Sequence, residues 1–304
     1  MLGSSFSPLR MKALEPAIAS IARDLIDDMR RVGPPGDIRE SLAEPLAASA
    51  ISLILGIPRE DHDKVLDWSE GCLDIRNIDR ATESDMQLTE YMERLLDQKL
   101  RNPSEDLLSD MSIYIRDNPH ESRREIIGLA AGLRFASQLN TPAAIDRAVY
   151  LFLTHPEYLD ELHSGSAALK RAVEEVLRHP HPVSPRVAGI PRYAHEDIGV
   201  DAHTIQRGDL VIFDLDEANR DSSVFDSPLE FHPDRRANQH LAFGYGGHYC
   251  VAASLARLEL KVVLETIFEM LPNLRLATDI DNLSRNSERL SGGLTKLPVS
   301  WDQG

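Results

Sequence analysis

The stretch FGYGGHYCVAASLARLE, residues 243 to 259, holds one of only two cysteines in the chain. Glycines at 244, 246 and 247 precede Cys250, and good helix formers follow it from 251 to 260. Glycine adopts positive φ and lets a backbone approach a flat group closely. The pattern predicts a wrapping loop with Cys250 at the start of a helix. Unpaired N–H groups and the helix dipole favour a thiolate there.

Such a thiolate has three chemical roles open to it: nucleophile, zinc ligand or haem-iron ligand. Zinc requires three or four ligands, and no Cys-x-x-Cys or suitable histidine pair accompanies Cys250. A cysteine nucleophile needs a nearby base, for which His248 is the only local candidate. Plain packing of a buried cysteine is the further alternative, and it is our interpretation of Cys72.

Composition and charge exclude several classes of partner. The chain has 304 residues, of which 42% are hydrophobic, enough to bury a large core. A net charge of −16 argues against nucleic acid or anionic lipid as the main partner, because both require a basic footprint. We find no apolar run of membrane-spanning length and no apolar signal core, and two cysteines argue against a disulfide framework. The expectation is therefore a cytoplasmic protein without a membrane partner.

Hydrophobic periodicity predicts helix after helix in the first half of the chain. Ser7 is expected to cap the first helix and Pro8 to begin it. The segment 121–154 would run about 50 Å and could cross a whole domain, with Pro142 expected to kink it or remove a hydrogen bond. The predicted helices span residues 8–32, 45–55, 60–78, 83–100, 121–154, 167–179 and a last segment ending near 270.

The second half changes character. Short β-type runs at 203–205 and 210–213, separated by Arg207-Gly208-Asp209, predict a hairpin with a glycine turn. Residues 294–301 form a strand-like ending. We expect a single domain over 1–304, with a helical part over 1–180 and a mixed β and loop part over 181–304.

The cysteine stretch resembles the haem-binding loop of the cytochrome P450 family. The matching pattern is Phe243-Gly244-x-Gly246-x-His248-x-Cys250, followed by Leu255-Ala256-Arg257. Ala252 stands where the family usually has glycine. The resemblance implies a P450-like fold, mainly α with a minor β region. It also implies haem b, with Cys250 as the axial iron ligand and Phe243, Gly244, Gly246 and His248 among the cofactor-binding residues.

Other landmarks of the family follow in the expected order. Glu175-x-x-Arg178, with Arg235 in FHPDRR, resembles its structural ion network, although a solvated surface pair is the alternative. The stretch 192–209 and ANRD at 218–221 resemble the strands beside the haem, which implies that Arg192 binds a haem propionate.

The resemblance begins late in the family's pattern. The segment SSFSPLRMKALEP, residues 4–16, resembles the stretch just after an early haem-contacting helix. We therefore expect a P450-like fold that is N-terminally truncated. A truncated gene product, a mis-called start and a naturally short variant remain open.

The central helix departs from the family. Its usual acid and hydroxyl, which deliver protons to iron-bound dioxygen, correspond to Leu139 and Asn140. A competing register supplies Arg134 and Phe135 instead. Leucine cannot relay a proton and an amide is a poor acid or base, whereas Thr141 could partly substitute if Pro142 shifts the register. Asn140 and Thr141 are the candidate catalytic residues, with merely polar residues of a buried helix as the alternative.

The resemblance implies a haem-thiolate monooxygenase of secondary metabolism. It would act on a small, mainly apolar organic molecule and receive electrons from a ferredoxin or flavodoxin. A peroxide-driven or coupling oxidation is a second hypothesis, because the acid is missing. A third is a degenerate relative that binds haem weakly or not at all and recruits another protein.

Overall fold

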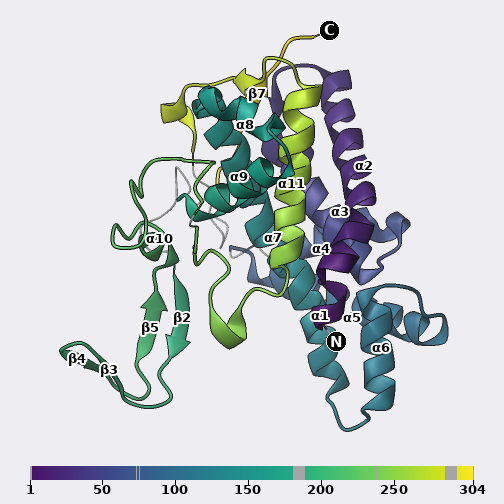
Figure 1. Ribbon diagram of the computed structural model, residues 1–304. Helices are drawn as coiled ribbons and strands as arrows, with labels where there is room; N and C mark the ends of the chain where they lie inside the picture. The colour runs from purple at the N-terminus through teal and green to yellow at the C-terminus, as the bar shows by residue number, and fades with distance from the viewer. Residues whose placement is uncertain are drawn as a thin grey trace.

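The computed structural model describes residues 2–72, 74, 76–180, 189–236, 238–284 and 293–303. Most of these residues belong to a helical body, from which a thin β arm projects (Figure 1). The α-helices are α1 (Leu2–Ser5), α2 (Pro8–Val32), α3 (Glu44–Leu55), α4 (His62–Cys72), α5 (Ile78–Arg101), α6 (Leu107–Asp117), α7 (Arg123–Thr154), α8 (Leu159–His163), α9 (Ser166–Arg178), α10 (Leu215–Ala218) and α11 (Ala253–Met270).

Shorter helical turns and strands connect this body. The turns are the π-helix η1 (Arg39–Ala43) and the 3₁₀ turns η2 (Arg59–Asp61), η3 (Pro156–Tyr158), η4 (Gly246–His248) and η5 (Ile280–Asn282). The strands are β1 (Gly36–Asp37), β2 (Ile190–Tyr193), β3 (Ile198–Val200), β4 (His203–Ile205), β5 (Leu210–Phe213), β6 (Arg275–Leu276) and β7 (Pro298–Ser300).

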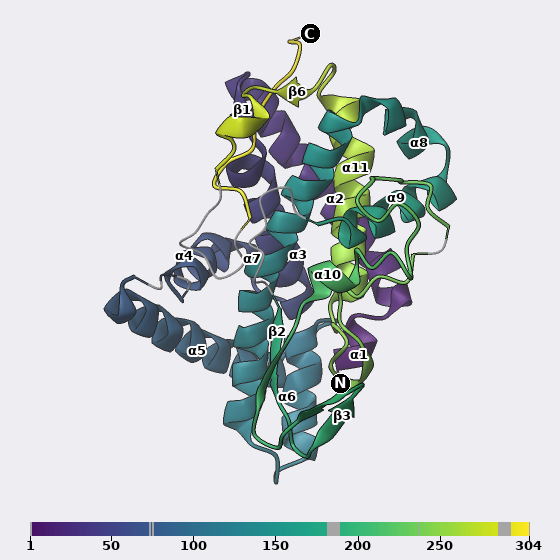
Figure 2. The ribbon, with the colours of Figure 1, turned by 90° about the vertical axis from the view of Figure 1, so that its left-hand side faces the viewer.

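The long helix α7 runs through the body and packs against α3, α5, α9 and α11, while α11 lies along α2 (Figure 2). Their facing side chains form one hydrophobic cluster that draws on both halves of the chain. Ile18, Phe152 and Val263, from α2, α7 and α11, are all fully buried in it. The central helix is thus fixed on several sides, and it provides a rigid wall for a site.

The first predicted helix is confirmed. The Ser7 hydroxyl accepts a hydrogen bond from the Arg10 N–H at 3.3 Å, and Pro8 occupies the first turn. The helix ends where Gly33 adopts a φ of +89° and its N–H donates to the Met29 carbonyl at 2.9 Å. A side-chain cap and a terminal glycine therefore set both ends, as the sequence indicates.

The boundaries around α4 and α5 differ from prediction. Helix α4 ends at Cys72 and α5 begins at Ile78, five residues before the predicted start. Asn77 caps α5, because its side-chain oxygen accepts the Arg80 N–H at 3.0 Å. Helix α6, capped by Asp106, was not predicted at all. Periodicity alone missed these caps.

The predicted hairpin between 203–205 and 210–213 is wrong. Strand β4 pairs with β3, and β5 pairs with β2, both antiparallel. Gly208 does turn the chain, with a φ of +94°, but its N–H donates to the Ala194 carbonyl at 2.8 Å. The turn therefore joins two ribbons, which together make the arm. The strand-like ending supplies β7, which lies between β1 and β6.

Candidate active site

The cysteine loop closes on itself through backbone hydrogen bonds. The Cys250 N–H donates to the Phe243 carbonyl at 2.9 Å, and the Gly244 N–H donates to the Leu241 carbonyl at 2.8 Å. Gly244 and Gly246 have φ of +71° and +73°, in the region that disfavours other residues. The loop conformation thus requires glycine at these two positions.

The thiol of Cys250 is half-buried and lies three residues before α11 begins. Burial raises its pKa above the ordinary value, and a hydrogen bond from the Ala252 backbone and the positive charge of Arg257 oppose only part of this effect. The backbone at the helix start thus favours the thiolate as expected, but burial outweighs it for the free thiol. The same two groups would still stabilise a sulfur made anionic by binding a metal.

An ion pair not predicted from the sequence holds this loop against α9. The Arg257 guanidinium donates from Nε to Glu174 Oε1 at 2.6 Å and from Nη2 to Oε2 at 2.9 Å. It also lies 4.5 Å from the centre of the Phe243 ring, and its Nη1 donates to the Tyr249 hydroxyl at 3.2 Å. Arg257 thus connects the first residue of the loop to α9 and α11.

Glu174 accepts a further hydrogen bond, from His240 Nε2 at 2.9 Å. Burial by itself raises the pKa of Glu174, but the bonds from His240 and Arg257 outweigh it and lower the pKa to about 2. Glu174 is therefore ionised throughout the neutral range. No sequence motif marks it, apart from its position beside Glu175.

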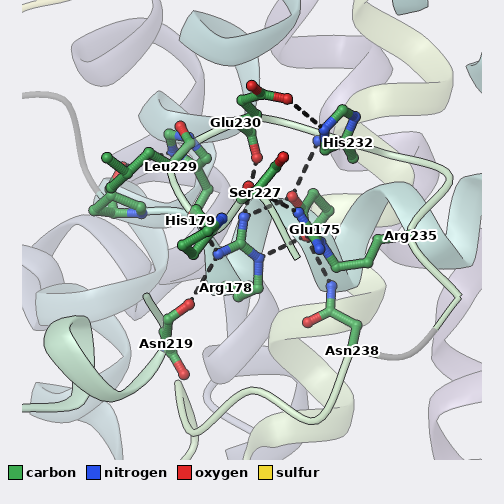
Figure 3. Close-up of polar contacts among 12 residues, drawn as sticks. Glu175, Arg178, His179, Asn219, Ser227, Leu229, Glu230, His232, Arg235 and Asn238 are labelled. Atoms are coloured by element: carbon green, nitrogen blue, oxygen red, sulfur yellow. Dashed lines mark hydrogen bonds and ion pairs between the residues drawn. The ribbon is translucent and has the colours of Figure 1, made fainter. Parts of the chain in front are cut away.

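The Glu175, Arg178 and Arg235 network is confirmed as a buried feature (Figure 3). Arg178 donates from Nε and Nη2 to the two carboxylate oxygens of Glu175, both at 2.8 Å. The backbone N–H of His232 and the side chains of Arg235 and Asn238 donate to the same carboxylate at 3.0 to 3.1 Å. The alternative of a solvated surface pair is wrong, since Glu175 and Arg178 are at most 1% exposed.

Arg178 also satisfies carbonyl groups of the chain that leads to the cysteine loop. Its Nη1 donates to the Asn219 and Pro228 carbonyls at 2.8 and 2.7 Å, and its Nη2 to the Glu230 carbonyl at 3.2 Å. The Asn219 side chain in turn accepts the Leu241 N–H at 2.7 Å. The buried network therefore positions the segment that enters the loop.

Arg192, predicted to bind a haem propionate, and His248, predicted to bind the cofactor, are both exposed. Arg192 lies on β2, and its Nη1 donates to the adjacent Pro191 carbonyl at 2.8 Å. His248 lies in the exposed turn η4 of the loop. The guanidinium of Arg192 and the imidazole of His248 are thus both accessible to a ligand that carries carboxylates.

Part of the central helix is exposed as a strip. Gly132, Ala136 and Asn140 recur at four-residue spacing and are exposed, whereas Thr141 is only 8% exposed. Neighbouring residues of a helix point about 100° apart, so Asn140 and Thr141 face different surroundings. In the competing register, Arg134 is fully buried and donates to the Gln138 amide oxygen at 2.8 Å.

The donor set fits haem better than zinc. The described ranges contain no group of three or more His, Cys, Asp or Glu side chains that could hold a metal ion, whereas haem iron requires only one protein ligand. Cys250 provides that sulfur, with the Ala252 N–H directed to it. A methyl group placed on Gly246 would meet no atom within 4 Å, so this side of the loop is open to a flat group.

Comparisons with known proteins agree with this site. A model of the cytochrome P450 family matches residues 167–296. Cytochrome P450-SOY of Streptomyces griseus is 35% identical over 303 residues, which cover 99% of this chain and 72% of that protein. The chain belongs to the cytochrome P450 family.

Further relatives agree in sequence and in fold. The mycinamicin IV hydroxylase/epoxidase of Micromonospora griseorubida is 35% identical over 98% of this chain and 75% of its own length. The crystal structure of the LnmA cytochrome P450 hydroxylase from the leinamycin pathway of Streptomyces atroolivaceus superposes with a TM-score of 0.88 at 32% identity. That superposition covers 99% of this chain and 76% of LnmA. The predicted fold, mainly α with a minor β region, is thereby confirmed.

Membership of this family sets the class of function. The protein is a P450-type monooxygenase, and its relatives include hydroxylases, epoxidases and monooxygenases of secondary metabolism. P450 monooxygenases carry haem, act on small molecules and receive electrons from redox partners. None of the helices in the described ranges combines the length and apolar character needed to cross a membrane.

Proposed function

We propose that Cys250 is the axial thiolate ligand of haem b, with Phe243, Gly244, Gly246 and His248 around it. The observation that carries this proposal is the closed loop, in which two left-handed glycines precede a sulfur that receives the Ala252 N–H. Exposed Arg192 would pair with a propionate, since a guanidinium offers a carboxylate charge-assisted bonds. When bound, haem b supplies the iron centre at which dioxygen is activated.

The residues of α7 would then orient the reacting molecules. The Asn140 amide, on the exposed strip, can donate a hydrogen bond to an oxygen atom and so hold it in place. Thr141, one residue on, would supply a hydroxyl. Leu139 cannot hold or move a proton, which favours peroxide-driven or coupling oxidation as a second candidate function.

The substrate is a small, mainly apolar organic molecule, as befits a family that acts on secondary metabolites. A ferredoxin or flavodoxin would donate the electrons. A cytoplasmic location accords with the two free thiols of Cys72 and Cys250. A single domain over residues 1–304 accords with the hydrophobic cluster shared by both halves.

The test compares electron donors on the haem-loaded protein. Ferredoxin with its reductase, or flavodoxin with its reductase, should reduce the protein, so that a carbon monoxide complex forms at a rate that saturates with donor concentration. This readout does not require the substrate. If neither donor reduces the protein, but the protein oxidises added organic probes with hydrogen peroxide, the second candidate function, peroxide-driven or coupling oxidation, replaces this proposal.

A further inference from the structure

A groove of about 1060 Å³ lies between α5 and α7, where α5 leads away from the central helix (Figure 2). Met86 and Leu88 of α5 and Ala131 and Phe135 of α7 line it, and Cys72 lies at its margin. This volume lies just above the range of about 300 to 1,000 Å³ that is typical of pockets for organic ligands. The groove is therefore large enough for an extended molecule.

Apolar and charged side chains share the walls of the groove, and several of the apolar ones are exposed. Ile78 and Met86, both on α5, are 75% and 66% exposed. Apolar side chains that line a concave surface are typical of ligand-binding sites. Phe135 precedes Leu139 by one helical turn, about 6 Å along α7, so the groove leads to the segment that holds Asn140.

The carboxylates of the groove differ in their pairing. Asp74, Glu90 and Glu93 have arginine partners, with the nearest atoms of Arg80, Arg94 and Arg123 at 3.5, 2.8 and 3.9 Å.

Asp85 is exposed, and within the described ranges no cation pairs with it. Arg124 of α7 also lines the groove, and no ion pair in the described ranges joins it to Asp85. Burial and then the charge of Asp85 raise the pKa of Cys72. The unpaired negative charge therefore lies at the Cys72 end.

We propose that this groove binds an amphipathic substrate that carries a protonated amine. The apolar part lies against Met86 and Phe135, and the ammonium group pairs with Asp85. This inference rests on the proposed function, because it names the substrate class of the same enzyme. It adds a cationic group to a ligand that was expected only to be mainly apolar.

The charge at the groove can be measured through Cys72. Holoenzyme is labelled with a cationic (trimethylammonium) or an anionic (sulfonate) thiosulfonate reagent, and modification of the Cys72 peptide is followed by mass spectrometry. We divide the rate of modification by the cationic reagent by the rate with the anionic reagent, and compare this ratio with that of a free thiol. Because the Cys72 pKa affects both rates equally, it does not affect the ratio. Asp85→Asn should lower this ratio about threefold at low ionic strength. Glu83→Gln, which removes a charge from the same helix outside the groove, should lower it clearly less.

Occupancy is tested with three probes of equal chain length, each below its micelle concentration. Dodecylammonium should protect Cys72 from a neutral thiosulfonate at several-fold lower concentration than dodecanol or dodecanoate, and Asp85→Asn should abolish the difference. Equal protection by all three, or protection by none, overturns the inference. The haem spectrum of the same samples reports separately on Cys250, so failure of the groove and failure of the proposed function are distinguishable.

Discussion

At the scale of single residues, the cysteine loop depends on backbone conformation more than on space. A methyl group on Gly244 would lie 3.8 Å from the His248 carbonyl oxygen, an ordinary contact, but φ there is +71°. We therefore expect Gly244→Ala to lower the free energy of unfolding by about 1 to 2 kcal/mol, measured by urea denaturation. Gly247→Ala is the matched control, because it has open space and no positive φ. An equal loss in both variants would show that the strain argument is incorrect.

Glu174 should make the free energy of unfolding depend on pH in the acidic range. Its pKa of about 2 lies below the ordinary 4.5, so its stabilisation is present above pH 4.5 and is lost as pH falls toward 2. Between pH 5 and pH 3, wild type should lose about 1 kcal/mol more unfolding free energy than Glu174→Gln, after allowance for partial solvent exposure. Parallel pH profiles for the two proteins would contradict the pairing with Arg257 and His240.

Asp146 should have the opposite dependence. Full burial raises its pKa to about 7, although Arg39 Nη1 lies 2.6 Å from Oδ2. A raised acid pKa gives stability that is complete below the unfolded value of 3.8 and lost as pH rises through 7. Wild type should therefore lose roughly 2 to 4 kcal/mol relative to Asp146→Asn between pH 4 and pH 8. A difference that stays constant over this range would mean that Asp146 is ionised throughout.

At the scale of elements, α7 can be tested by restoring the family's pair. Leu139→Asp combined with Asn140→Thr should raise the fraction of reducing equivalents recovered in oxidised product, because a carboxyl group and a hydroxyl can move protons. The peroxide-driven rate should change little. The checks are NADH consumed per product formed, and the same product formed with hydrogen peroxide. If the double variant formed more product only in the peroxide-driven reaction, proton delivery would not be what limits the wild-type enzyme.

The ends of α2 and the end of α7 were the helix boundaries best predicted from the sequence, whereas the start of α5 was misplaced and α6 was missed, although side chains cap both. Ser7 with Pro8 and Gly33 marked α2 correctly, and α7 ends at Thr154 as predicted. The α4 and α5 boundaries were missed because apolar spacing runs continuously across residues 60–78. The hairpin error has another cause: strand pairing is decided by contacts between distant segments, and β2 and β3 carried no local signal of their partners.

In the candidate site, too, local features were predicted and contacts between distant segments were missed. The cysteine loop is a local motif, so its glycines and Cys250 could be identified from one short stretch and its resemblance to the haem-binding loop of the family. The Glu174–Arg257 pair joins residues 83 positions apart, and no local pattern reports such a contact. The raised pKa of Cys250 was also missed, because burial depends on the packed structure and outweighs the helix start.

At the scale of the whole molecule, one buried network connects the helical body to the site. Glu175 and Arg178 of α9 hold carbonyl and amide groups from Asn219 to Asn238, the segment that enters the cysteine loop. The chain spans 72% and 75% of the two curated relatives compared above.

Thiolate ligation by Cys250 is the central claim, and the reduced carbon monoxide spectrum tests it most directly. Haem-loaded wild type should give a strongly red-shifted Soret band, and Cys72→Ala should retain it. Cys250→Ala should lose the band even where haem stays bound. A red-shifted band in Cys250→Ala, or its absence in wild type that has taken up haem, would contradict the account.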